Sequence, residues 1–237
     1  YCHIGTGNYN PVTSEKYTDL AIMTSDQDLG SDINNVFTQL TGVGKNTLQR
    51  KIWSAPFSLR EKLEASIERE TRHAKEGKKS GITAKINALT DETIIDKLYE
   101  ASQAGVKIDL IVRGACALRS GIKGLSDNIK VRSILGRFLE HSRVFLFSND
   151  GKNEVYIGSA DWMTRNMDGR VEVCFPVTDP SLKKRIIQET LKSDMRDNLG
   201  SWQLTQDHSY IRKKPGEKSI FSAQQYNIDK LCLRSTR

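Results

Sequence analysis

Cysteine is scarce in this sequence. Its 237 residues contain four, Cys2, Cys116, Cys174 and Cys232, which are widely separated and form no CxxC pair. This spacing does not match a zinc site, and so few cysteines in a chain of this length are typical of a reduced, cytosolic protein. Two disulfides stay open as an alternative, but we expect Cys116 and Cys174, which lie in apolar stretches, to be small core residues.

Long apolar runs and a phosphate-binding loop are also absent from the sequence. No run of about 18 apolar residues predicts a transmembrane helix, and no secretory signal is recognisable. The loop pattern GxxxxGK followed by Ser or Thr does not occur. The string GVGKNT at residues 42–47 has a similar composition, but it lacks the spacing of that loop and a preceding strand, so it carries little weight.

The sequence does contain an excess of positive charge. Lys and Arg number 36 against 29 Asp and Glu, which gives a formal net charge of +7. This excess favours polyanionic partners such as a nucleotide, polyphosphate, nucleic acid or an acidic membrane surface, although soluble basic proteins without such a partner are common at this charge. Hydrophobic residues make up 37% of the chain, which is enough for a sizeable core.

The first 40 residues resemble the end of a domain. Tyr1 is not a start methionine, and two predicted strands precede a helix over 26–40 in which apolar residues recur at spacings of three and four. Glycine and polar residues at 42–47 then interrupt the pattern. We therefore predict a fragment in two parts. Residues 1–44 are the carboxyl-terminal piece of a first catalytic domain whose start is missing, and residues 45–237 are a second one.

Strands and helices alternate in the second part. The predicted elements are an edge strand at 53–56, a helix over 58–75, strands at 82–87 and 106–112 with a helix over 91–104 between them, a strand at 171–177, and helices from Pro180 and around Ile228. A strand–helix–strand order is typical of a parallel or mixed sheet with helices on its faces. The predicted fold class is α/β, a mixed sheet flanked by helices.

A β-hairpin is predicted in the middle of the second part. Residues 144–147 read as a buried strand, Asp150 and Gly151 as a turn, and residues 155–157 as the returning strand. The two outer ends of such a hairpin lie side by side, so side chains that flank it should meet at one end of the sheet.

Four polar residues flank the hairpin: His141 and Arg143 before it, Ser159 and Asp161 after it. Imidazole can act as nucleophile, acid or base near neutral pH, and a guanidinium group forks onto phosphate oxygens. We expect Asp161 to orient the imidazole by accepting its N–H. This combination of groups suits phosphoryl transfer better than most other chemistries.

A weaker copy of the pattern opens the chain. The string HIGTGNYN (residues 3–10) gives glycine, hydroxyl and amide residues in an order similar to that of GSAD at 158–161, so a duplicated site is expected, with Asn8 and Asn10 in the first copy. This arrangement is similar to that of the phospholipase D superfamily, whose motif is HxK, an acidic residue and GSxN. Here the motif is degenerate, because Arg143 stands for the lysine and Ser148 for the acidic residue.

Several longer strings closely resemble the C-terminal catalytic region of the bacterial polyphosphate kinases. They are HIGTGNYN, YTDL, IVRGACAL, LSDNI, FLEHSRV and GSADWMTRN, and the resemblance runs from Tyr1 to about Arg237. The resemblance implies a phospholipase D-like α/β/α sandwich and reversible transfer of the ATP γ-phosphate to polyphosphate through a phosphohistidine. In that family the phosphorylated histidine lies in an HxK motif upstream of HIGTGNYN, and no such motif precedes His3 in this sequence.

The resemblance also implies roles for single residues. Tyr17, Arg113 and His141 match the positions that contact ATP, with His141 on the phosphates and not itself the main phosphorylated residue. Without the resemblance, Tyr17 reads as a half-buried strand residue and Arg113 as a surface arginine that closes a strand, and for His141 a core histidine is as good an interpretation as a functional one. Further motif residues are Asn8, Asn10, Ser159 and Arg165.

The implied substrates are ATP or ADP and inorganic polyphosphate, with Mg²⁺ held mainly by nucleotide oxygens and by residues outside this fragment. We expect catalytic roles for His141, Arg143 and Asp161, no metal ligands within the chain, and no specific nucleic acid. A homo-oligomeric, cytoplasmic enzyme is expected, with peripheral membrane association left open. Two alternatives are a phospholipase D-type phosphodiesterase and a non-catalytic module that binds polyanions through its charge alone.

Overall fold

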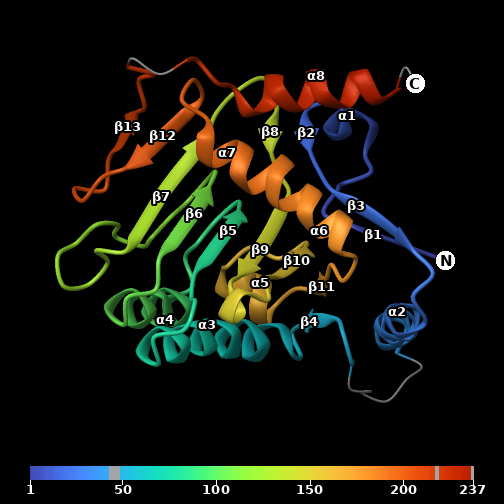
Figure 1. The fold of residues 1–237 in the computed structure, drawn as a ribbon. Coiled ribbons are helices and arrows are strands. Elements are labelled where there is room, and N and C mark those ends of the chain that lie inside the picture. The colour runs from blue at the N-terminus through green and yellow to red at the C-terminus, as the bar shows by residue number, and fades with distance from the viewer. Residues whose placement is uncertain (43–48, 217–218, 236–237) are drawn as a thin grey trace.

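A nine-stranded sheet forms the centre of the computed structural model, which describes residues 1–42, 49–216 and 219–235 (Figure 1). In spatial order its strands are β13 (Tyr210–Arg212), β12 (Ser201–Leu204), β7 (Ile129–Ile134), β6 (Ile108–Val112), β5 (Ile82–Ile86), β9 (Arg143–Phe147), β10 (Glu154–Gly158), β11 (Glu172–Pro176) and β4 (Trp53–Ala55). β5, β6 and β7 are parallel, and all other neighbours are antiparallel. The sheet is therefore mixed, as predicted.

Helices cover both faces of this sheet (Figure 1). On one face lie α3 (Leu59–Lys75), α4 (Glu92–Gln103) and the short α5 (Thr164–Asp168); over the other pass α6 (Pro180–Ile186), a π-helical segment η2 (Ile187–Lys192) and α7 (Ser193–Arg196). The last helix, α8 (Ala223–Ser235), lies along the end of the sheet next to α7. The predicted α/β fold class is confirmed.

Successive side chains along the strands pack into two separate hydrophobic cores, one on each face of the sheet. Phe145 and Phe147 of β9 pack into the core under α3 and α4, whereas Val144 packs into the core on the opposite face. Likewise Leu110 and Ile111 of β6 belong to opposite cores. Because successive strand side chains point to opposite faces, a nearly continuous apolar strand is needed where both faces are covered.

The N-terminal segment packs on the second face. It comprises β1 (Cys2–Gly5), α1 (Pro11–Ser14), β2 (Tyr17–Thr18), β3 (Ala21–Thr24) and α2 (Gln27–Leu40). β1 and β3 pair antiparallel, and β2 pairs in parallel with β8 (Leu139–Glu140), which connects β7 to β9. The sequence predicts two strands before α2; the structure has three short ones and the turn of helix α1.

The predicted hairpin is confirmed as β9 and β10, joined at residues 149–151 by a 3₁₀ turn in which Asp150 and Gly151 have positive φ. Glu70 of α3 is fully buried and accepts the Asn149 and Gly81 amide hydrogens at 2.9 and 3.0 Å. The turn end of the hairpin is thereby fixed to α3, and the open end is left at the opposite edge of the sheet.

The predicted boundary between residues 44 and 45, and residues 43–47 of the string GVGKNT, lie outside the described residues. Among the helices that the structure describes, none has both the length and the apolar character needed to cross a bilayer.

Candidate functional site

Polar side chains gather at the edge of the sheet where the hairpin is open. β5 and β6 end here, followed by Asn87 and Arg113; β9 begins here with Arg143, after His141; and Asp161 follows β10. The carboxyl ends of parallel strands are the usual place for ligand sites in open α/β sheets, because loops there are free to carry functional groups. The open hairpin adds its own polar residues to the same edge.

The ring of His141 is buried and is contacted at both nitrogens. Nδ1 lies 2.8 Å from Asp19 Oδ1, and Nε2 lies 2.9 Å from Nη1 of Arg143. A guanidinium group can only donate, so Nε2 accepts from Arg143 and Nδ1 carries the proton that is donated to Asp19. His141 is thus held in one orientation and one tautomer.

Asp19, and not Asp161, orients the imidazole, which corrects the prediction from the sequence. Asp161 is occupied elsewhere: its Oδ1 accepts from the Asn87 amide at 2.7 Å, and its two oxygens accept from Nε and Nη2 of Arg143, both at 3.2 Å. Asp19 reaches the ring from the N-terminal segment, where Thr6 also donates its hydroxyl to Oδ1 at 2.6 Å. Asp161 therefore acts on His141 only through Arg143.

Arg143 is a buried link between these groups. Its Nη1 donates both to Nε2 and, at 2.8 Å, to the backbone oxygen of His141, while its other nitrogens fork onto Asp161. Both Arg143 and Asp161 are less than a tenth exposed. A charged, hydrogen-bonded pair of this kind keeps a fixed positive charge beside Nε2.

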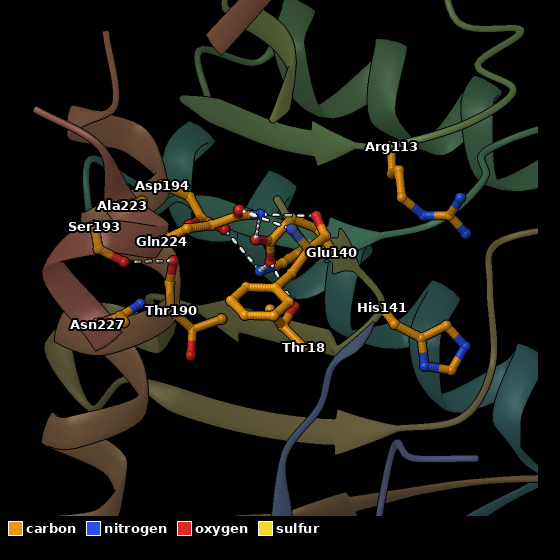
Figure 2. A network of polar contacts seen from close by, with 12 residues as sticks. Thr18, Arg113, Glu140, His141, Thr190, Ser193, Asp194, Ala223, Gln224 and Asn227 are labelled. Carbon is orange, nitrogen blue, oxygen red and sulfur yellow. Dashed lines mark hydrogen bonds and ion pairs between the residues drawn. The ribbon is translucent and has the colours of Figure 1, made fainter. Parts of the chain in front are cut away.

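Tyr17 lies beside His141, and Arg113 lies at the same end of the sheet. The ring of Tyr17 is centred 4.8 Å from that of His141 and tilted by 41°. Arg113 is half-buried, and its Nε donates to Asn87 Oδ1 at 3.2 Å. Figure 2 shows Arg113 and His141 on the same side of a neighbouring polar network. A cavity of about 430 Å³ is lined by Tyr17 and Arg113 together with Lys16 and Arg137, so it is rich in positive charge.

The structure does not bring every predicted residue to His141. The Ser159 hydroxyl instead donates to the carboxylate of Glu172, on the neighbouring strand β11. Asn10 caps α1 by accepting the Val12 amide at 3.0 Å. Asn8, Asn10 and Arg165 are exposed. Of the four residues expected to converge at the hairpin, His141, Arg143 and Asp161 do so and Ser159 does not.

A buried charged network lies directly behind the site (Figure 2). Lys85 Nζ is 2.5 Å from Glu140 Oε2 and 2.8 Å from Asp194 Oδ2, and all three residues are at most 5% exposed. Burial raises the pKa of Asp194 to about 6, an effect that Lys85 opposes and Glu140 reinforces. Burial acts in the same direction on Glu140, but Lys85 more than offsets it and holds the pKa of that carboxyl below its usual range.

Asp19, Asn87 and this network were not predicted from the sequence. Lys85 carried a signal, because a lysine inside a strand that is otherwise apolar must find buried partners. The partners themselves lie far away in sequence, since Glu140 is separated from Lys85 by 55 positions.

Within the part of the chain that the structure describes, no group of three or more His, Cys, Asp and Glu residues is placed to hold a metal ion. Asp19 and Asp161 are already engaged by His141 and Arg143. The described residues therefore do not fit a magnesium site made by the protein alone, since Mg²⁺ needs oxygen ligands that are free to coordinate it.

Two family models match the chain in sequence order. The model described as polyphosphate kinase C-terminal domain 1 matches residues 1–46, and that described as polyphosphate kinase C-terminal domain 2 matches residues 52–224. Among curated relatives, polyphosphate kinases from Paraburkholderia phytofirmans and Burkholderia multivorans are 51% and 49% identical over 98% of this chain. The chain spans 34% of the length of each of them.

A solved structure agrees with these matches. The crystal structure of polyphosphate kinase from Porphyromonas gingivalis superposes with a TM-score of 0.93 at 37% identity, covering 98% of this chain and 36% of that one. With both domain models matched in order and the same fold present in a solved relative, the chain belongs to the polyphosphate kinase family.

Proposed function

We propose that this chain forms part of an enzyme that reversibly transfers the γ-phosphate of ATP to inorganic polyphosphate, through a phosphohistidine in sequence outside this chain. The observation that carries the proposal is the ring of His141, held at both nitrogens by Asp19 and Arg143 beside a cavity lined by Tyr17 and Arg113. Family membership supports the choice of substrates.

Positioning and charge stabilisation supply most of the catalysis in phosphoryl transfer. Arg113 donates through Nε to Asn87. In the proposed reaction the other nitrogens of its guanidinium group bind phosphate oxygens. Arg143 keeps its positive charge next to His141 Nε2. For His141 to accept a proton at Nε2, its contact with Arg143 must open. A protonated phosphate oxygen then donates to Nε2, and the freed guanidinium nitrogen of Arg143 donates to another phosphoryl oxygen.

His141 is not the phosphorylated residue in this proposal. A histidine nucleophile needs a free lone pair aimed at phosphorus, whereas Nδ1 carries a proton shared with Asp19 and Nε2 is covered by Arg143. A phospholipase D-type phosphodiesterase is disfavoured because Arg143 stands for the lysine of its motif and Ser148 for its acidic residue.

The remaining parts of the proposal concern the intact enzyme. Magnesium arrives with the nucleotide, held mainly by phosphate oxygens. The enzyme is a cytoplasmic homo-oligomer, and its partners are ATP and polyphosphate. The division into residues 1–44 and 45–237 is supported by the separate matches of two domain models to residues 1–46 and 52–224.

Three assays test this function in the intact enzyme that contains this chain. With ATP and magnesium it should form ADP and polyphosphate, and with ADP and polyphosphate it should form ATP. Hydrolysis of bis(p-nitrophenyl) phosphate without ADP formation would instead indicate a phosphodiesterase. Binding of polyphosphate with a steep salt dependence, no nucleotide preference and no turnover would indicate a polyanion-binding module.

A further inference from the structure

The strand pair β2–β8 brings the two halves of the site together. Thr18 of β2 stands between Tyr17 and Asp19, and Glu140 of β8 directly precedes His141. The pair is only two residues long, with Tyr17 opposite Leu139 and Thr18 opposite Glu140. So short a ladder gives few backbone hydrogen bonds, and a few side-chain contacts therefore decide how firmly Asp19 is held against His141.

Glu140 makes most of these side-chain contacts. Its Oε2 accepts the Thr18 hydroxyl at 2.8 Å and also contacts Lys85 Nζ, so one carboxylate oxygen ties β2 to the central strand β5. Its Oε1 accepts from Nε2 of Gln224, on α8, at 2.7 Å. The same side-chain amide donates to the backbone oxygen of Phe138 and accepts from the backbone N–H of Phe138. Both oxygens of Glu140 are thus used to fix the segment that leads into His141.

Lys85 fixes Glu140 in turn. The lysine is 4% exposed, comes from the middle of the sheet, and is braced on its other side by Asp194 of α7. A buried cation between two carboxylates has one favourable position, because moving away from either leaves a buried charge unpaired. Its ammonium group is paired with both of these carboxylates.

We propose that Lys85 is a positioning residue: through Glu140 and Thr18 it holds β2 against β8, and so keeps the Asp19 carboxylate on Nδ1 of His141. The structural part of this inference stands on the contacts alone, while its consequence for catalysis rests on the proposed function.

The first test measures the imidazole directly, in this chain and without any substrate. The ¹⁵N chemical shifts of labelled histidine distinguish a ring with its proton fixed on Nδ1 from a mixture of tautomers. The chain has four histidines, and His141→Gln identifies the signal of His141. In Lys85→Met, which keeps the length of the side chain without its charge, the His141 signals should move away from the Nδ1–H pattern, and those of the other histidines should stay.

A milder variant covers the case in which Lys85→Met does not fold. Thr18→Val replaces one hydroxyl by a methyl group, leaves the three buried charges paired, and should move the His141 signals in the same direction by a smaller amount. Matched controls are Arg69→Met and Glu70→Gln, which remove a cation and a buried carboxylate at the turn end of the same hairpin. They should lower the melting temperature without moving the His141 signals.

The second test is kinetic and uses the intact enzyme. Lys85→Met and Thr18→Val should lower kcat for polyphosphate synthesis with a smaller change in KM for ATP, by up to about 100-fold for the lysine variant, which is typical of a misplacement of about 1 Å at a reacting group. Arg69→Met should leave kcat within about twofold of the parent, as expected for a substitution away from the site.

The two tests separate the inference from the proposed function. His141 signals that stay in the Nδ1–H pattern in folded Lys85→Met, or in Thr18→Val, overturn the positioning role whatever the enzyme does. Signals that move while the parent enzyme makes no polyphosphate uphold the positioning role and overturn the function. Equal shifts in the Arg69 and Glu70 controls show general loosening, which also overturns the inference.

Discussion

The imidazole of His141 lies between a carboxylate and a guanidinium group that come from different parts of the chain. Asp19 accepts its Nδ1 proton, and Arg143, itself held by Asp161, covers Nε2. A ring held at both nitrogens has one orientation, so its Nε2 points in one direction. In the proposed function, Asp19 and Asp161 act on the reaction through the position of that nitrogen atom.

Substitution of Arg113 by lysine tests the phosphate fork. Arg113→Lys keeps the charge but loses bidentate bonding, and a hydrogen bond to a charged group contributes about 1.5–3 kcal/mol, so the apparent affinity for ATP should fall about ten- to a hundredfold. The melting temperature should be unchanged, because Arg113 is half-buried with one side-chain bond, to Asn87. Calorimetric titration with ATP measures this, with the exposed Arg72→Lys as control. A lower melting temperature with normal ATP affinity would assign Arg113 a structural role.

Substitution of His141 tests its part in catalysis. His141→Ala in the intact enzyme should lower the turnover number for polyphosphate synthesis by about 10²–10⁴, the range for a lost acid or base group. His141→Gln keeps a donor for Asp19 but cannot carry a proton, so it should recover only part of the loss. ATP affinity should fall less than turnover if the contact strengthens in the transition state. Near-normal synthesis by folded His141→Ala would leave His141 as a packing residue.

At the scale of elements, local patterns in the sequence predict the hairpin and the long helices, but not strands β7, β12 and β13. The apolar run at 144–147, the Asp150-Gly151 turn and the return at 155–157 predict the hairpin, and the structure confirms it as β9 and β10. The helix predicted over 58–75 begins at Leu59 and ends at Lys75. Such elements depend on residues only a few positions apart. The strand pair β2–β8 has no comparable pattern, since each strand is two residues long and its partner lies more than 100 positions away.

The buried network makes stability depend on pH through one element, α7. Burial raises the pKa of Asp194 from 3.8 to about 6, so between about pH 4 and 6 the folded protein keeps a proton that the unfolded chain has lost. The contribution of Asp194 to the free energy of unfolding is therefore present below pH 4 and falls as the pH rises through 6. In Asp194→Asn this dependence disappears.

The measurement is urea unfolding of the parent chain and Asp194→Asn at several pH values from 4 to 7. The difference in unfolding free energy should shift in favour of the variant as the pH rises, which isolates Asp194 from Lys85, Glu140 and Asp197 nearby. Asp96→Asn, an exposed position on α4, is the control and should show a constant difference. A constant difference for Asp194→Asn as well would mean that Asp194 stays ionised in the folded protein.

At the scale of the whole molecule, the site depends on contacts that cross the chain. Asp19 and His141 are 122 positions apart in the sequence. Asp19 and Asp161 both lie close to the ring in the folded chain, and the sequence does not show which of the two contacts it. The hairpin favours Asp161 because it lies at the same edge, but Arg143 and the Asn87 amide occupy it. The packing of the N-terminal segment on the sheet is what places the Asp19 carboxylate on the His141 ring. The resemblance to a family could name His141 and Arg113, but not their partners.

The same packing predicts how this chain behaves alone with ATP. Phosphorylation of His141 requires a free lone pair on Nδ1 or Nε2, and these atoms are engaged by Asp19 and Arg143. Incubation with γ-labelled ATP and magnesium should therefore leave the chain unlabelled. The intact enzyme that contains this chain, run in parallel, should under the proposed function acquire label that is lost in acid. Stable label mapped to His141 by peptide mass spectrometry would reverse the assignment and make His141 the nucleophile.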